Sequence, residues 1–254
     1  MELWRLKKLT SSSVKTLLDG KYVPITFRIG FLEASYTTVA ESFVAWRRET
    51  RQKIKTREIE GHLPALLEGL EPLSMPPCRD LLLPTRSRWT AFFDNSAKIS
   101  DPASPIGHMC TRIKCRGVVA SCIPNTIGRS KRSKGTYGAV VFELFGAEQR
   151  KFLNYERSVA AANDGGRWTF IAEGEVQSFE ETDVYREKTI RDRFTPEMLE
   201  RYCRAMDISI FDEGFYGPHG LLIETVYPAS VMSDSLVMSL AEAQEDIGLK
   251  SIGA

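Results

Sequence analysis

From Trp89 to Met206 the pattern of apolar and polar positions predicts one helix, four strands and two more helices, each bounded by residues that start or stop such elements. Arg88 to Asn95 is typical of an aromatic strand that stops at a turn-forming Asp-Asn pair. Ser104 and Pro105 predict the start of a short helix whose apolar stripe extends to Ile113. Further strands are predicted over residues 118–123, 137–145, 151–161 and 167–173.

Short turns join these later strands, so neighbouring strands must run antiparallel. In the last of them Trp168, Phe170 and Ala172 fall on one face. We expect that face to be covered by one helix over residues 182–190 and by a second that begins at Thr195. The predicted fold is α+β, an antiparallel sheet with helices packed on one face. The remaining chain predicts a loop over residues 212–220, a strand over 221–227 and a helix over 235–247.

The first third of the chain predicts a hairpin and a helix. Residues 14–18 and 21–29 flank Asp19-Gly20, a dipeptide typical of a two-residue hairpin turn. From Tyr36 to Val44 apolar residues recur at helical spacing, and the helix is expected to run on through residues 47–57. Prolines between residues 71 and 84 indicate a connector. We therefore predict an N-terminal hairpin-and-helix region, residues 1–80, as a separate unit or as a layer of the α+β domain, residues 85–254.

Composition and charge are those of an ordinary globular protein. The chain has 254 residues, of which 43% are hydrophobic, and its 34 basic and 33 acidic residues leave a formal charge of +1. No global field therefore favours nucleic acid or an anionic membrane. The N-terminus lacks the apolar run of a signal peptide and no membrane span is evident, so we expect a cytoplasmic protein. The five cysteines are expected to be reduced thiols without disulfides.

Candidate catalytic and metal-binding residues are few. His108, Cys110, Cys115 and Cys122 lack the paired spacing of a zinc site, so we expect neither a metal nor another cofactor. The common hydrolase motifs are absent. An enzyme of unrecognised class would use His219 in its glycine-rich loop, together with the loop carboxylates of Asp94 and Asp164.

Two basic segments offer a nucleic-acid hypothesis. Residues 47–57 carry six basic side chains and one glutamate, and residues 129–134 carry four positive charges. Solvated surface is the simpler interpretation of both. Binding of RNA or DNA through them is the alternative, and it predicts a steep loss of affinity with added salt.

The opposite charge is concentrated between residues 173 and 183, which hold five carboxylates and no base. Part of this cluster is explained by the favourable field at a helix start. The remainder predicts an acidic patch, edged by aromatic residues, that binds a basic protein partner. The predicted partner-binding residues are Glu173, Glu175, Phe179, Glu180, Glu181, Asp183 and Tyr185.

Three stretches, Trp89–Asn95, Gly165–Phe170 and Arg191–Leu199, resemble segments of uncharacterised bacterial cytoplasmic proteins, some of them associated with immunity to bacterial toxins. The resemblance spans roughly residues 86–210 and includes no motif of known chemical role. It implies a non-enzymatic immunity protein that neutralises a toxin by occluding it. The sequence therefore favours an intracellular protein-binding protein, with the enzyme and nucleic-acid hypotheses as alternatives.

Overall fold

The computed structural model describes residues 15–50, 53–127, 134–149, 154–228, 230 and 233–249. Its helices are α1 (Tyr36–Glu49), α2 (Leu63–Glu68), α3 (Ala103–Ile113), α4 (Pro196–Ala205) and α6 (Leu240–Asp246). Short 3-10 helices are η1 (Leu17–Gly20), η2 (Val184–Arg186), η3 (Ile190–Asp192) and η4 (Glu213–Phe215). The strands are β1 (Arg28–Leu32), β2 (Lys53–Glu60), β3 (Leu73–Met75), β4 (Arg79–Pro84), β5 (Thr90–Asp94), β6 (Gly117–Ile123), β7 (Ala139–Phe145), β8 (Tyr155–Asp164), β9 (Arg167–Gly174), β10 (His219–Val226) and β11 (Leu236–Met238).

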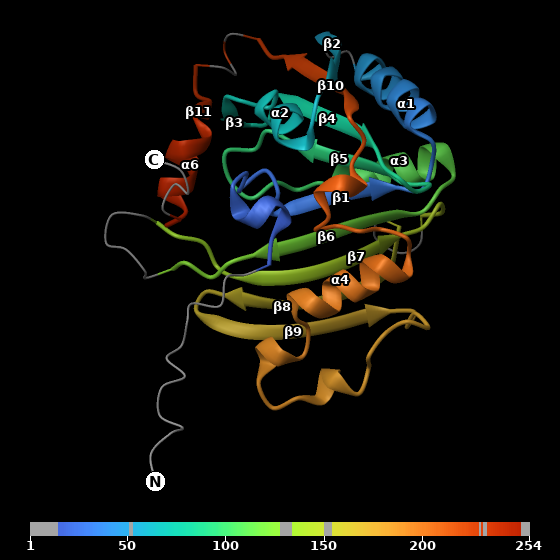
Figure 1. Ribbon diagram of the computed structural model, residues 1–254, viewed down its shortest axis with the longest axis vertical. Coiled ribbons are helices and arrows are strands. Elements are labelled where there is room, and N and C mark those ends of the chain that lie inside the picture. The colour runs from blue at the N-terminus through green and yellow to red at the C-terminus, as the bar shows by residue number, and fades with distance from the viewer. Residues whose placement is uncertain are drawn as a thin grey trace.

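Nine of these strands form one antiparallel sheet within the described residues. Their order is β2-β10-β4-β5-β1-β6-β7-β8-β9, so β2 and β9 are the two edges (Figure 1). The α+β class and the antiparallel sheet predicted from the sequence are confirmed. Strands from both sides of the proline-rich segment share this sheet, because β1 lies between β5 and β6.

Helices cover both faces of the sheet, whereas the sequence predicted a single covered face. On the first face α2 and α4 pack on strand residues such as Phe93 and Phe142. On the second face α1 and α3 pack on strand residues such as Phe92 and Val119. The alternation along β5 shows the cause, since Ala91 and Phe93 join one core cluster while Phe92 joins the other. A strand that carries apolar side chains on both faces must be covered on both sides.

The hairpin predicted around Asp19-Gly20 is wrong. Asp19 and Gly20 do adopt positive φ, but they belong to the 3-10 helix η1, and the chain continues through turns to β1. Leu17, Val23 and Ile25 are fully buried, so the flanking apolar residues enter the core and do not pair with each other. The hairpin was predicted from residues that are neighbours in the sequence, whereas the core contacts formed in its place involve residues that are distant in the sequence.

Three helix predictions also need correction. The helix from Tyr36 ends at Glu49, and the basic residues beyond it form the edge strand β2, which pairs with β10 along its whole length. Residues 182–190 contain the 3-10 helix η2 and the start of η3, with no α-helix. Residues 235–247 divide into β11 and α6, which Ser239 caps with a capping box.

Two further predictions are wrong. Residues 71–84 are not a connector, because they contain β3 and β4, and the buried leucines of β4 place it inside the sheet between β5 and β10. The predicted loop of residues 212–220 contains η4 and the first two residues of β10, so His219 lies in a strand.

The remaining helix and strand predictions are confirmed within a few residues. The aromatic strand is β5, the short helix is α3, and the strands that follow are β6, β7, β8, β9 and β10. Thr195 caps α4 with its side chain and Pro196 occupies the first turn, as the sequence predicted. No helix in the described part of the chain has the length and apolar character that crossing a bilayer requires.

Candidate functional site

The acidic segment leaves the end of β9, and the chain then passes below β9 in the view of Figure 1 before it rises to α4. The aromatic residues of this segment are half-buried. The ring of Phe179 packs at 6.1 Å from that of Phe142 and at 5.4 Å from that of Tyr202, and the ring of Tyr185 lies 5.1 Å from that of Phe170. These contacts anchor the segment to the core cluster beneath it.

Glu180 forms the segment's main polar anchor. Arg157 of β8 donates to both carboxylate oxygens, Nε to Oε1 at 2.8 Å and Nη2 to Oε2 at 2.6 Å. The two side chains are 3% and 0% exposed. The backbone N–H of Gln177 and the hydroxyl of Tyr185 also donate to the carboxylate, each at 2.8 Å. This buried pair is therefore fully hydrogen-bonded, which is the condition under which buried charges are tolerated.

Glu181 forms a second, more exposed ion pair. Arg201 of α4 donates to both of its carboxylate oxygens, at 2.7 and 2.8 Å. The hydrogen bonds from Arg201 lower the pKa of Glu181. The side chains are 37% and 53% exposed, so this pair contributes little to stability.

The other predicted acids face solvent. Glu173, Glu175 and Asp183 are exposed, and none has an ion pair among the described residues. Glu187, which the sequence analysis did not select, is also exposed in the same loop. Of the seven predicted partner-binding residues, the structure thus leaves three carboxylates free and engages the other four within the protein.

The residues of the enzyme hypothesis lie far apart. Asp94 of β5 lies opposite Asp80 of β4, which in turn lies opposite Ile223 of β10. His219 is four residues from Ile223 on β10, so it is displaced from Asp94 by roughly 13 Å along the strand direction. Asp164 is at the tip of the β8-β9 hairpin, four strands from β5. The structure does not bring the three side chains together.

Each member of that set has a local environment of its own. Asp94 is buried and accepts hydrogen bonds from Ser100 Oγ at 2.6 Å and from Ser96 N at 2.9 Å. Burial raises the pKa of Asp94 in spite of these bonds. His219 is exposed and its ring meets that of Tyr36 edge-on at 5.3 Å. Asp94 therefore has a structural environment, and His219 lies at the surface.

The basic segments are partly neutralised. Arg47 donates to Asp80 at 2.7 Å and its guanidinium lies 4.5 Å from the centre of the Trp46 ring, while Lys55 pairs with Glu224 at 3.7 Å. The second basic segment lies outside the described residues except for Lys134, which pairs with Asp246 at 3.7 Å. Lys53 and Arg57 of β2 are exposed and have no ion pair among the described residues, so the first segment is neutralised only in part.

The cysteine and histidine set is dispersed. His108 stacks on Trp46 at 4.8 Å, Cys110 and Cys115 lie near the end of α3, and Cys122 belongs to the core cluster on the other face. All five cysteines are free thiols. No group of three His, Cys, Asp or Glu side chains within the described residues could hold a metal ion.

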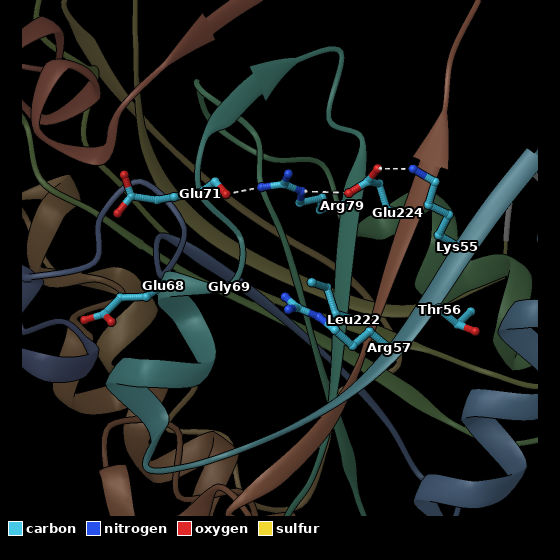
Figure 2. Close-up of a pocket in the computed structure, with 9 residues that line it drawn as sticks. All are labelled: Lys55, Thr56, Arg57, Glu68, Gly69, Glu71, Arg79, Leu222 and Glu224. Atoms are coloured by element: carbon cyan, nitrogen blue, oxygen red, sulfur yellow. Dashed lines mark hydrogen bonds and ion pairs between the residues drawn. The ribbon is translucent and has the colours of Figure 1, made fainter.

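A groove of about 530 Å³ that the sequence analysis missed lies between the β2 edge and the end of α2. Figure 2 shows a chain of polar contacts across it, from Lys55 to Glu224, from Glu224 to Arg79, and from Arg79 to the backbone of Glu71. Arg57 projects beside Leu222 with no ion pair among the described residues. The lining residues come from four elements that are distant in sequence, so no local pattern could have revealed the groove. It contains none of His219, Asp94 and Asp164.

Comparison of the chain with protein-family models, with curated proteins and with solved structures finds no match.

Proposed function

We propose that this protein is a non-enzymatic protein-binding protein that engages a basic partner through the exposed carboxylates of the segment from residue 173 to residue 187. The observation that carries the proposal is the buried Arg157–Glu180 pair, which ties this segment to strand β8. Buried ion pairs offset a large desolvation cost and add little net stability. They do fix geometry, and a rigid surface loses little conformational entropy when a partner binds.

The exposed acids fit such a partner. Glu175, Asp183 and Glu187 surround the anchored residues and have no ion pair among the described residues. Exposed carboxylates of this kind raise the rate of encounter with a positively charged surface. Glu180 and Glu181 act indirectly in this proposal, because Arg157 and Arg201 already occupy their carboxylates.

The narrower form of the proposal is that the partner is a basic bacterial toxin domain, neutralised by occlusion. It rests on the resemblance of residues 86–210 to proteins associated with toxin immunity and on the sign of the exposed charge. The separation of His219, Asp94 and Asp164 speaks against the enzyme hypothesis in its stated form. Neutralisation of Arg47 and Lys55 weakens the nucleic-acid hypothesis.

Capture from a lysate of the native host tests the proposal. The full chain is immobilised and retained proteins are identified by mass spectrometry, in parallel with Glu175→Lys/Asp183→Lys. The wild type is expected to retain a basic protein, and the double variant should lose about tenfold in affinity because two steering charges are reversed. Glu180 is left unchanged, since its removal would strand the buried Arg157 charge at a cost of about 3–5 kcal/mol.

The matched control is Glu41→Lys/Glu245→Lys. Both residues are exposed, lie outside the acidic segment, and give the same change in net charge when reversed. The control should retain the partner as the wild type does. Retention of no specific protein, or equal retention by the acidic-segment variant, would contradict the proposal.

A further inference from the structure

The two edges of the sheet differ in chemistry. β2 has five charged residues among its eight, in the sequence KIKTREIE. Charged edge strands resist pairing with another chain. β9, with the sequence RWTFIAEG, has five successive uncharged residues from Trp168 to Ala172, most of them aromatic or β-branched. Such residues favour strand pairing, so β9 is the unprotected edge.

The direction of the backbone groups in β9 follows from two contacts with β8. Glu175 and Glu156 lie opposite each other, and the N–H of Glu175 donates to the carbonyl of Glu156 at 2.9 Å. Arg167 lies opposite Asp164 across a two-residue turn, a position that forms a hydrogen-bonded pair. Both contacts direct the backbone groups of odd-numbered β9 residues toward β8.

The even-numbered residues therefore direct their backbone groups outward. These are Trp168, Phe170 and Ala172, and no hydrogen bond to their N–H or C=O groups from outside the strand is found among the described residues. The segment after β9 lies over one face of the strand, since Arg191 contacts the ring of Trp168 and Tyr185 that of Phe170. It leaves the row of outward groups without a partner.

We propose that β9 pairs antiparallel with β9 of a second copy of this chain, about a two-fold axis at Phe170. Phe170 then faces its own copy and Trp168 faces Ala172 of the other chain. All three residues have outward backbone groups, so these are the hydrogen-bonded pairs of an antiparallel ladder. The two nine-stranded sheets would become one continuous sheet.

The same register pairs the side chains favourably. Arg167 lies opposite Glu173 of the second copy, and Thr169 lies opposite Ile171, each pair occurring twice by symmetry. All four residues are exposed in the single chain, and Ile171 is 47% exposed. In non-hydrogen-bonded positions facing side chains approach closely, so opposite charges attract and Ile171 is covered. A shift by two residues in one direction would place Arg167 opposite Ile171 and lose both charge pairs, and a shift in the other direction would place Arg167 opposite Glu175, beyond the end of β9.

Sedimentation equilibrium of the full chain tests this inference. One strand pair makes a small interface, so a dissociation constant between about 1 µM and 1 mM is expected. Arg167→Glu and Glu173→Arg each create two like-charged pairs and should be monomeric over the same concentrations. An equimolar mixture of these two variants restores every charge pair and should dimerise as tightly as the wild type.

Lys53→Glu on the β2 edge is the control and should dimerise normally, since that residue is equally exposed but lies on the opposite edge. Unchanged thermal unfolding of each variant establishes that it is folded. A wild type that stays monomeric, a dimer that tolerates either reversal, or a mixture that stays monomeric would overturn the inference. The inference does not rest on the proposed function, whose test alters Glu175 and Asp183 and leaves Arg167 and Glu173 intact.

Discussion

Most of the buried charge in this protein is held by partners that lie far away in the sequence. Arg157 meets Glu180 across 23 residues and Arg47 meets Asp80 across 33 residues. Residue types alone predicted that 173–183 would be acidic, but they could not show which carboxylates were already paired. The exposed acids Glu173, Glu175 and Asp183 were predictable from the sequence, whereas the internal role of Glu180 was not, because Arg157 reaches it only in the folded sheet.

Asp80 leads to a prediction of pH-dependent stability. Burial raises the pKa of Asp80 from 3.8 to about 6, with Asp94 adding to the shift and Arg47 opposing it. The folded state therefore binds a proton more tightly than the unfolded state. As pH rises from about 4 to about 6, Asp80 should lower the free energy of unfolding by up to about 3 kcal/mol.

The measurement compares the wild type with Asp80→Asn by urea unfolding at several pH values. The asparagine cannot ionise, so the free energy of unfolding of the wild type minus that of the variant should fall between pH 4 and pH 7. Taking this difference cancels the titration of groups common to both proteins. A difference that is constant over this range, or that rises, would show that Asp80 is not the origin of the effect.

At the scale of elements, helix α3 lies unusually close to the sheet because two glycines face it. A Cβ atom built on Gly30 of β1 would lie 2.7 Å from Cγ1 of Ile106, and one on Gly117 of β6 would lie 2.5 Å from Sγ of Cys110. Such distances are too short for carbon contacts. The absence of side chains at these two positions therefore sets the distance between α3 and strands β1 and β6.

Gly30→Ala should consequently destabilise the protein by about 1–3 kcal/mol through overpacking. The companion change Ile106→Ala opens a cavity at the same place and should cost about 2–5 kcal/mol by itself. In the double variant the new methyl group enters the space that Ile106 vacated. The cost of the two changes together should thus be smaller than the sum of their separate costs.

Thermal or denaturant unfolding of the four proteins in this double-mutant cycle measures the coupling. The coupling energy should favour the double variant by more than about 0.5 kcal/mol, the lower end of values for residues in contact. Strictly additive costs would mean that the Gly30 and Ile106 positions do not compete for the same space, and would contradict the account of α3 packing.

Elements were predictable where local signals and core packing agree. In α4 the side chain of Thr195 caps the helix, Pro196 occupies its first turn, and its apolar stripe packs in the core, as the sequence predicted. β2 shows the opposite case, since KIKTREIE has no strong strand pattern and becomes a strand because β10, more than 150 residues later, offers eight paired positions. The failed hairpin at Asp19-Gly20 has the same cause, because its apolar flanks are drawn into the core.

At the scale of the whole molecule, the order of strands interleaves the N-terminal and C-terminal parts of the chain. β1 fills the space between β5 and β6, and β4 lies between β5 and β10. Antiparallel pairing of consecutive strands was predictable for β6 to β9, because their turns are short. The position of β1 was not, since two helices and three other strands separate it from β5, and β5 and α3 come in addition before β6.

This interleaving predicts that residues 85–254 cannot fold without the first 84. Removal of β1 and β4 would leave strands β5, β6 and β10 with unpaired edges in the middle of the sheet, and removal of α1 would take the Phe43 ring away from Phe92. A fragment of residues 85–254 should therefore lack a cooperative thermal transition.

Co-expression with a fragment of residues 1–84 should restore a cooperative transition, because the second fragment supplies every missing contact. The full chain, cut at the same boundary by an engineered protease site after folding, is the matched control and should keep its transition. Cooperative unfolding of the 85–254 fragment alone would instead establish it as an independent domain, and would mean that β5 and β6 can pair or be covered without β1.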